Sequence, residues 1–272
     1  MIRTDWVWGA RAMVARQLRS IVCILLLVAT GPAVALAETP VDLELVIVAD
    51  VSISMDRDEK RLQQEGFVSA FRHSDILEAI RTGPHGRIAV TYIEWGGDGQ
   101  QRVVVPWMMI SGPTSALHFA SRLERNRPAR MVRGTSISSA LIKAATLIER
   151  SGFAGTRRII NLSGDGVNNK GPELPDVRAE ILAGGITING MPIIYKGLLD
   201  GVIDNPESQP PASVLIGYYE EQVIGGPDAF VEPVKSRDDY AGAIRRKLKR
   251  EIEAPALAGL SGRGAQALLQ SR

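Results

Sequence analysis

The chain has 272 residues, of which 45% are hydrophobic, 23% charged and 5% aromatic. These proportions are typical of a globular protein with one substantial core or two small ones, built mainly from aliphatic side chains. The formal net charge is +2, and it falls to −1 without residues 1–37, so the charge gives no reason to expect a nucleic-acid partner.

Residues 1–37 have the layout of a secretory signal peptide. Four arginines accompany a short apolar stretch over 21–29, and Ala35-Leu36-Ala37 forms a cleavage signal. We therefore expect a mature protein that begins at Glu38 and is periplasmic or secreted. An uncleaved membrane anchor is the alternative, although the apolar stretch is short for a membrane span.

Removal of this leader changes the composition of the remaining chain. Residues 1–37 hold four arginines and one aspartate, so the formal charge falls from +2 to −1. They also hold Cys23, the only cysteine. The mature protein is therefore expected to have no disulfide, no thiol chemistry and no stable membrane span. Met1 and Met13 are alternative starts of the leader.

Beyond the leader, predicted strands alternate with predicted helices, which is typical of an α/β layer fold. The expected strands cover residues 41–49, 87–95, 101–110, 157–162, 186–194 and 223–231. One helix is expected to start after Asp56. Four others are expected over residues 114–123, 137–148, 175–183 and 240–252. Residues 200–215 are expected to form a loop. One domain is thus predicted over residues 41–252, followed by a disordered tail over 253–272.

Local patterns support these assignments. The first strand, over 41–49, is apolar without interruption, which indicates burial on both faces. Asp56 and Glu59 form a capping box at the start of the first helix. The run Gly96-Gly97-Asp98-Gly99 joins the second and third strands as an antiparallel hairpin. We therefore predict a Rossmann-like, mostly parallel central sheet with one antiparallel edge strand and helices on both faces. The basic residues of the last helix are interpreted as a solvated face.

Small oxygen-bearing side chains lie where two predicted strands end and where one helix starts. Asp50, Ser52 and Ser54 follow the first strand, Asp165 follows the fourth, and Thr135 opens a helix. In a parallel sheet these points share one edge, where open α/β sheets bind ligands. Two carboxylates and three hydroxyls suit a hard divalent cation such as Mg²⁺. The alternative is that these Asp and Ser residues serve only as helix caps.

Three motifs in this order resemble the metal-ion-dependent adhesion site of von Willebrand factor A domains. They are Asp50-Val51-Ser52-Ile53-Ser54, Gly134-Thr135 and Asp165-Gly166. The resemblance covers residues 41–250 and is greatest to uncharacterised bacterial exported proteins with a single A domain. It implies that Mg²⁺, or Mn²⁺ or Ca²⁺, is bound directly by the three hydroxyls of Ser52, Ser54 and Thr135. It also implies that Asp50 and Asp165 act mainly through water or hydroxyl bridges.

Two features depart from the family pattern. Gly164 stands where a threonine commonly precedes the second aspartate, and residues 195–220 are long and proline-rich for this fold. The second departure leaves the surface around the predicted metal undefined by the resemblance.

The resemblance further implies that one metal position is left open for a carboxylate of a partner. We therefore expect non-covalent binding of an unidentified protein through an exposed Asp or Glu. Arg127, Arg130 and Arg133 would reinforce the selection of an acidic partner, unless they are only solvated loop charges. Specificity is expected to come from the loops at 96–99, 125–134 and 166–175.

A phosphohydrolase is the alternative function. Residues 163–169 resemble the G-D-G-x-N-D segment of haloacid-dehalogenase-type phosphotransferases, whose nucleophilic aspartate would be Asp50. However, Ser52 stands where hydrolytic members have an acid/base aspartate, and Asn169 replaces the last aspartate of the segment. The required lysine could only be Lys143, in the middle of a predicted helix. The sequence thus offers no complete catalytic set, and we predict that the protein is not an enzyme.

Histidine and tryptophan are the two other residue types that could form a site. The three histidines have no ligand spacing, so a zinc site is not expected. Trp95 ends the second strand near the predicted metal edge, and it is interpreted either as an exposed recognition residue or as a half-buried packing residue.

Overall fold

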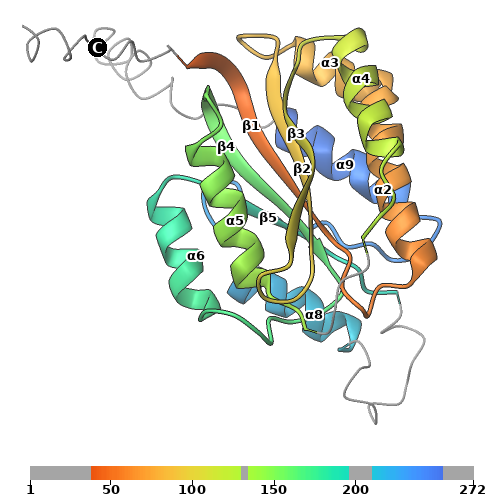
Figure 1. The fold of residues 1–272 in the computed structure, drawn as a ribbon, viewed down its shortest axis with the longest axis vertical. Coiled ribbons are helices and arrows are strands. Elements are labelled where there is room, and N and C mark those ends of the chain that lie inside the picture. Colours follow the sequence, from red (N-terminus) through yellow and green to blue (C-terminus); the bar gives the residue numbers. More distant parts are fainter. Residues whose placement is uncertain (1–37, 130–133, 196–209, 254–272) are drawn as a thin grey trace, which may run out of the picture. The chain divides into compact units, whose positions relative to one another are not determined.

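Five strands form one mixed sheet in the computed structural model, in the order β3-β2-β1-β4-β5 (Figure 1). Neighbours are parallel throughout, except that β3 pairs antiparallel with β2 at one edge. This confirms the predicted sheet and its single hairpin. The strands are β1 (Thr39–Asp50), β2 (Ile88–Trp95), β3 (Gln101–Ile110), β4 (Phe153–Gly164) and β5 (Thr187–Pro192).

The structure describes residues 38–129, 134–195 and 210–253. The predicted signal peptide, Arg130, Arg133, residues 200–209 of the expected loop and residues 254–272 of the predicted tail lie outside these ranges, so those predictions stay predictions.

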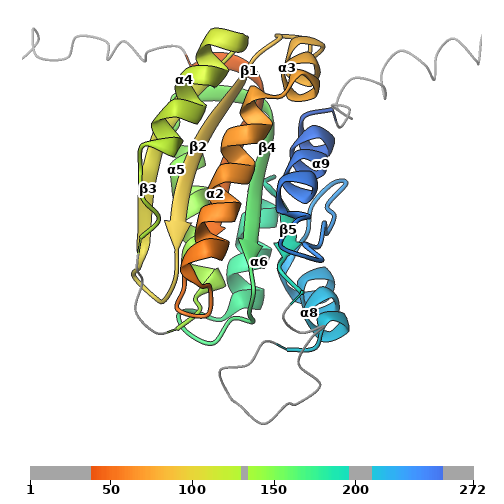
Figure 2. The ribbon, with the colours of Figure 1, turned by 90° about the vertical axis from the view of Figure 1, so that its right-hand side faces the viewer.

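Helices cover both faces of the sheet, as expected (Figure 2). None of the helices within the described ranges is long and apolar enough to span a membrane. One face carries α2 (Arg57–Arg72), α3 (Ser74–Arg81), α4 (Pro113–Glu124) and α9 (Tyr240–Glu253). The other carries α5 (Ile137–Glu149), α6 (Leu174–Ala183) and α8 (Ala212–Tyr218).

The central strand β1 shows why its sequence is apolar without alternation. Side chains of successive strand residues point to opposite faces of a sheet. Leu45 and Ile47 belong to the core beneath α2 and α9, whereas Val46 and Val48 belong to the core beneath α5 and α6. Both faces are therefore dry, and each position of the strand favours an aliphatic residue.

The first helix begins where its capping box predicts. The N–H of Glu59 donates to the carboxylate of Asp56 at 2.8 Å, and the N–H of Asp56 donates to the Glu59 carboxylate at 2.6 Å. An additional helix that was not predicted, α3, starts immediately after α2 with His73 as its N-cap.

Two predictions for the C-terminal third were wrong. Part of the expected loop over 200–215 is helical, because α8 starts at Ala212 and buries Leu215 in the core. The helix continues as a π-helical turn, η1 (Tyr219–Val223).

The expected strand over 223–231 is also absent as a continuous strand. This segment meets β5 only through isolated bridges at Gly225 and Val231, followed by one at Val234. Gly226 has a φ of +94°, and Pro227 follows it, so the segment cannot maintain a regular ladder there.

The last helix is amphipathic as predicted, but its basic residues do not all face solvent. Lys247 is fully buried and forms an ion pair with Glu251, which is 1% exposed. The Glu251 carboxylate also accepts hydrogen bonds from the side-chain amides of Asn161 at 2.7 Å and Asn189 at 3.0 Å. A buried charge of this kind requires such partners, and periodicity alone does not reveal them.

Candidate metal centre

Three chain segments meet at the lower edge of the sheet in Figure 1. β1 ends at Asp50, β4 ends one residue before Asp165, and α5 begins two residues after Thr135. β1 and β4 are parallel neighbours, so their last residues lie side by side. The backbone N–H of Asp165 donates to Oδ2 of Asp50 at 3.4 Å. The structure therefore brings the two predicted aspartates together.

The predicted serines complete this cluster. The N–H of Ser52 donates to Oδ1 of Asp50 at 2.7 Å, and the hydroxyl of Ser54 donates to Oδ1 of Asp165 at 2.6 Å. The two serine hydroxyl oxygens lie 3.1 Å apart. A tight turn after β1 thus folds both hydroxyls back toward the carboxylates.

Thr135 reaches the same place from the start of α5. Its N–H donates to the side-chain oxygen of Asn169 at 2.9 Å, and its carbonyl accepts the N–H of Asn169 at 2.9 Å. A β-carbon added to Gly166 would lie 3.8 Å from the Thr135 hydroxyl oxygen, so the threonine side chain packs against the Asp165-Gly166 turn. Asn169 thus fixes the position of Thr135 next to the second aspartate.

The cluster places two carboxylates in a site almost closed to solvent. Asp50 is 0% exposed and Asp165 is 1% exposed. Burial, and next the adjacent charge of Asp165, raises the pKa of Asp50 to about 7. Lys60 is near enough to interact electrostatically with both carboxylates, although burial lowers the pKa of its own ammonium group. A divalent cation would offset the repulsion between the two carboxylates.

The donor set fits a hard cation. It consists of carboxylate and hydroxyl oxygens, which Mg²⁺ and Ca²⁺ prefer, and Mg²⁺ in particular takes few protein carboxylates. Among the residues that the structure describes, no group of three or more His, Cys, Asp or Glu side chains is placed to hold a metal. A cation at this edge would therefore depend on Ser52, Ser54 and Thr135, whose role as ligands stays a prediction.

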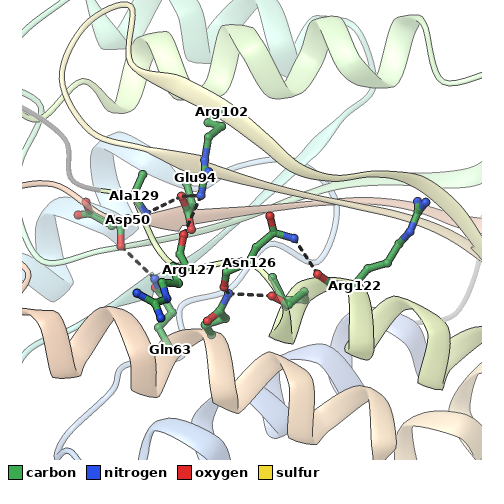
Figure 3. A network of polar contacts seen from close by, with 10 residues as sticks. Asp50, Gln63, Glu94, Arg102, Arg122, Asn126, Arg127 and Ala129 are labelled. Carbon is green, nitrogen blue, oxygen red and sulfur yellow. Dashed lines mark hydrogen bonds and ion pairs between the residues drawn. The ribbon is translucent and has the colours of Figure 1, made fainter.

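A buried glutamine on α2, which was not predicted as a site residue, joins the two strands that precede the aspartates. The side-chain amide of Gln63 donates to the carbonyl of Asp50 at 3.0 Å (Figure 3). The side-chain oxygen of Gln63 accepts the hydroxyl of Ser163 at 2.7 Å. The only sequence signal for this role is a polar residue on the apolar face of a helix.

Trp95 has neither of its expected roles. The side chain is 0% exposed, and its indole N–H donates to the carbonyl of Ser163 at 3.1 Å. Trp95 pairs with Asp50 across β1 and β2, and its ring and Oδ2 of Asp50 both lie beside Gly164, so the indole is next to the cluster. It therefore helps to support the carboxylate edge.

Tyr219 is a second buried residue at this edge that sequence reasoning missed. A β-carbon on Gly164 would lie 2.8 Å from the Tyr219 hydroxyl, 3.0 Å from Oδ2 of Asp50 and 3.0 Å from the ring of Trp95. These neighbours leave no room for the threonine that commonly stands at position 164. The Tyr219 hydroxyl is fully buried and has no hydrogen-bond partner within the described residues. Burial, with a further contribution from both aspartates, raises its pKa.

Glu94, at the end of β2, fixes the chain that follows α4. Its carboxylate accepts from Arg102 at 2.8 Å and from the N–H of Ala129 at 3.0 Å (Figure 3). Arg102 also donates to the carbonyl of Arg127 at 3.0 Å. Of the three arginines predicted near the Thr135 loop, Arg127 is therefore held close to the sheet edge.

Asn169 and Lys143 do not lie where the phosphohydrolase alternative would need them. Asn169 supports Thr135 through its side chain and backbone. Lys143 lies in the middle of α5 and, in the described part of the chain, makes no hydrogen bond or ion pair with Asp50 or Asp165. Lys60 on α2 is the lysine that interacts electrostatically with both carboxylates.

The sequence matches a family model described as a protein of unknown function, DUF1194, over residues 40–256. No curated protein matches it.

Several solved structures share the fold. The pilus adhesin SpaC from Lactobacillus rhamnosus GG, in an open conformation, matches at 14% identity with a TM-score of 0.55, covering 79% of this chain and 30% of SpaC. Proximal thread matrix protein 1 from the mussel byssus, with a zinc-occupied MIDAS motif, matches at 14% identity with a TM-score of 0.52, covering 79% and 47%. BatB from Bacteroides thetaiotaomicron matches at 17% identity with a TM-score of 0.51, covering 78% and 100%.

At these identities the similarity concerns the fold, which is that of von Willebrand factor A domains, as predicted. The chain spans less than half the length of the adhesin and byssus chains.

Proposed function

We propose that this chain, which belongs to the DUF1194 family and has the fold of von Willebrand factor A domains, binds a protein partner through a divalent cation. The observation that carries this proposal is the hydrogen-bonded cluster of Asp50, Ser52, Ser54 and Asp165, with Thr135 against it. The cluster contains hard oxygen donors but no activated nucleophile paired with a base, so its chemistry suits attachment better than turnover.

Each residue of the cluster has a distinct role in this proposal. Ser52, Ser54 and Thr135 would bind the cation directly, and Asp50 and Asp165 would hold its water molecules and the serine hydroxyls. The bound cation would supply an open position for a carboxylate of the partner. Coulomb attraction is strong where water is excluded, so one Asp or Glu could anchor the complex. The fold shared with a pilus adhesin and with a matrix protein that has a zinc-occupied motif supports a binding role.

Export is a second part of the proposal. Residues 1–37 would direct the chain out of the cytoplasm, and the mature protein would act in the periplasm or outside the cell. Amino-terminal sequencing of exported material should then begin at Glu38. Retention of residues 21–37 in the exported species would refute cleavage.

Thermal unfolding with added Mg²⁺ or Mn²⁺ tests the metal. A ligand that binds only the native state stabilises it by about 2.7 kcal/mol at a free concentration of about 100 times its Kd. We expect this increment in the wild type and its loss in Asp50→Ala. Asp176→Ala, at an exposed position on α6, should retain it. Equal stabilisation of wild type and Asp50→Ala would sink the metal assignment.

Affinity capture from the cell envelope tests the partner. The wild-type protein should capture a protein that is lost with EDTA and lost with Asp50→Ala, and Asp176→Ala should capture it normally. If the same proteins are captured with EDTA and with Asp50→Ala, the partner binds through another face of the protein.

The phosphohydrolase alternative retains one supporting observation, which is the position of Lys60 near the two carboxylates. A generic phosphoester assay separates the two functions. Hydrolysis that disappears in Asp50→Asn would favour the enzyme, and we expect no hydrolysis by the wild type.

A further inference from the structure

A groove with a volume of about 1180 Å³ lies beside the candidate metal centre. One wall is a single face of α2 over its whole length, from Arg57 to Arg72. The other wall is Glu124, at the end of α4, and residues 126–129. An α-helix rises about 1.5 Å per residue, so the 16 residues of α2 span roughly 24 Å. At about 3.3 Å per residue, an extended segment of roughly seven residues fits that length.

The groove begins at the metal centre itself. Ile53 lines its near end, and this residue lies between Ser52 and Ser54 in the chain. Its side chain is 59% exposed, although it is a large aliphatic group. A ligand whose carboxylate reaches the serine hydroxyls would therefore pass over Ile53 before it enters the groove.

Hydrogen bonds fix both walls in place. The side-chain amide of Gln64 donates to the carbonyls of Leu123 at 2.9 Å and Asn126 at 2.6 Å, which ties α2 to the opposite wall. At the far end, Arg72 and Glu124 form an ion pair at 2.6 Å. The Glu94 and Arg102 contacts hold the outer wall to the sheet (Figure 3). A site that is formed in advance loses little ordering entropy when it binds.

The charges of the lining are mostly positive. Arg61 pairs with Asp58 and Glu65, and Arg72 pairs with Glu124. The remaining cations of the groove are Arg57, Lys60 and Arg127, and no carboxylate within the described ranges forms an ion pair with them. Of these three, Lys60 also interacts electrostatically with Asp50 and Asp165. Apolar groups lie among these cations, at Ile53, Val68, Pro128 and Ala129.

We propose that this groove binds an extended acidic segment of the partner, whose carboxylates meet Arg57, Lys60 and Arg127 and whose apolar side chains cover Ile53 and Val68. The inference rests on the proposed function, because attachment to the metal sets the direction in which the segment enters the groove. The groove also restricts the partner to proteins with an acidic segment, because a single carboxylate on a basic or neutral surface would not match its charges.

Fluorescence anisotropy with a labelled synthetic peptide, Glu-Ala-Glu-Leu-Glu-Ala-Glu, tests the proposal on the protein without its leader. We expect the peptide to bind in Mg²⁺ and its glutamine analogue to bind at least about tenfold more weakly. Charge reversal by Lys60→Glu or Arg57→Glu should weaken binding by about five- to tenfold, and added salt should weaken it further. Lys143→Glu, on α5 at the opposite face of the sheet, is the matched control and should bind normally.

Peptide binding in EDTA and by Asp50→Ala distinguishes the proposed groove from the proposed metal site. Binding that still depends on Mg²⁺ and on Asp50, but ignores Lys60→Glu and Arg57→Glu, would overturn the groove and leave the metal site intact. Binding that ignores EDTA but is lost in Lys60→Glu would support the groove and refute the metal. Failure of the acidic peptide to bind the wild type at millimolar concentration would overturn the groove. Self-association of the wild type that Lys60→Glu abolishes would also overturn it, because a second copy would then be the occupant.

Discussion

The hydroxyl of Ser54 donates a hydrogen bond to Oδ1 of Asp165 across 2.6 Å, although the two residues are 111 positions apart in the chain. The bond joins the turn after β1 to the residue that follows β4, and it holds a hydroxyl next to a carboxylate at the proposed metal centre.

Replacement of Ser54 by alanine should therefore have two separable effects. Without metal, loss of the hydrogen bond to a buried carboxylate should reduce the unfolding free energy by about 1 kcal/mol. With Mg²⁺, most of the metal-dependent stabilisation should also disappear, because a proposed metal ligand is lost. Urea unfolding in EDTA and in Mg²⁺ measures both. Ser69→Ala, at an exposed position on α2, should leave the Mg²⁺ increment unchanged and should raise the metal-free unfolding free energy by about 0.5 kcal/mol or less, because alanine favours a helix. An unchanged Mg²⁺ increment in Ser54→Ala would contradict the assignment.

The raised pKa of Asp50 predicts an unusual pH dependence for the metal-free protein. An acid whose pKa rises from 3.8 to about 7 on folding keeps its proton better in the folded state. Its contribution to stability is therefore complete below about pH 4 and is lost as the pH rises through 7, by at most about 4 kcal/mol.

Asp50→Asn has no such group to titrate. Between pH 5 and 8 in EDTA, the wild type should lose stability relative to Asp50→Asn, and the difference should level off above the folded-state pKa. Urea unfolding at several pH values gives both profiles, and parallel profiles would show that Asp50 does not titrate in this way.

Tyr219→Phe should have opposite effects on stability and metal binding. The tyrosine hydroxyl is fully buried without a hydrogen-bond partner among the described residues. Its removal should raise the unfolding free energy of the metal-free protein by about 1 kcal/mol. The same hydroxyl lies beside the Asp50 carboxylate, where it can donate to water around a bound cation, so Mg²⁺ affinity should fall. Tyr218→Phe is not a suitable control, because its hydroxyl accepts the N–H of Asn168. A metal titration followed by calorimetry checks the second effect, and a loss of stability in EDTA would contradict the first.

The buried pair of Lys247 and Glu251 should be far more sensitive than its exposed neighbour. Both members are almost completely buried, so Lys247→Met would leave the Glu251 charge without its cation and should cost about 3–5 kcal/mol. Lys249→Met breaks a pair of the same spacing with Glu253, but those side chains are 43% and 47% exposed. That variant should cost less than about 0.5 kcal/mol. Equal losses in the two variants, measured by chemical unfolding, would show that burial does not decide the outcome.

The sheet and the carboxylate edge could be predicted because their signals are local. The apolar run of β1, the Asp56 capping box and the glycine-rich hairpin each depend on a few adjacent residues. The position of Asp50 and Asp165 at strand ends then follows from the geometry of parallel sheets.

The remaining features depend on contacts between distant segments. Lys247 is buried only because Asn161 and Asn189 supply donors to its partner from β4 and β5. Tyr219 reaches the carboxylates through a π-helical turn that no periodicity indicates, and Gly225, Gly226 and Pro227 interrupt what reads as an apolar strand.

The π-helical turn at Tyr219–Val223 makes chain length a determinant of this edge. Such a turn contains one residue more than a turn of α-helix, and each residue of an α-helix rotates the chain by about 100°. Deletion of one residue there would therefore either turn Tyr219 away from Asp50 or pull Val223 out of the core. In a homologue with a regular helix at this place, the equivalent of Tyr219 would no longer fill the space next to Gly164. We expect such a homologue to have the threonine that this chain cannot accommodate. Among homologues, the length of this helix and the residue before the second aspartate should therefore vary together.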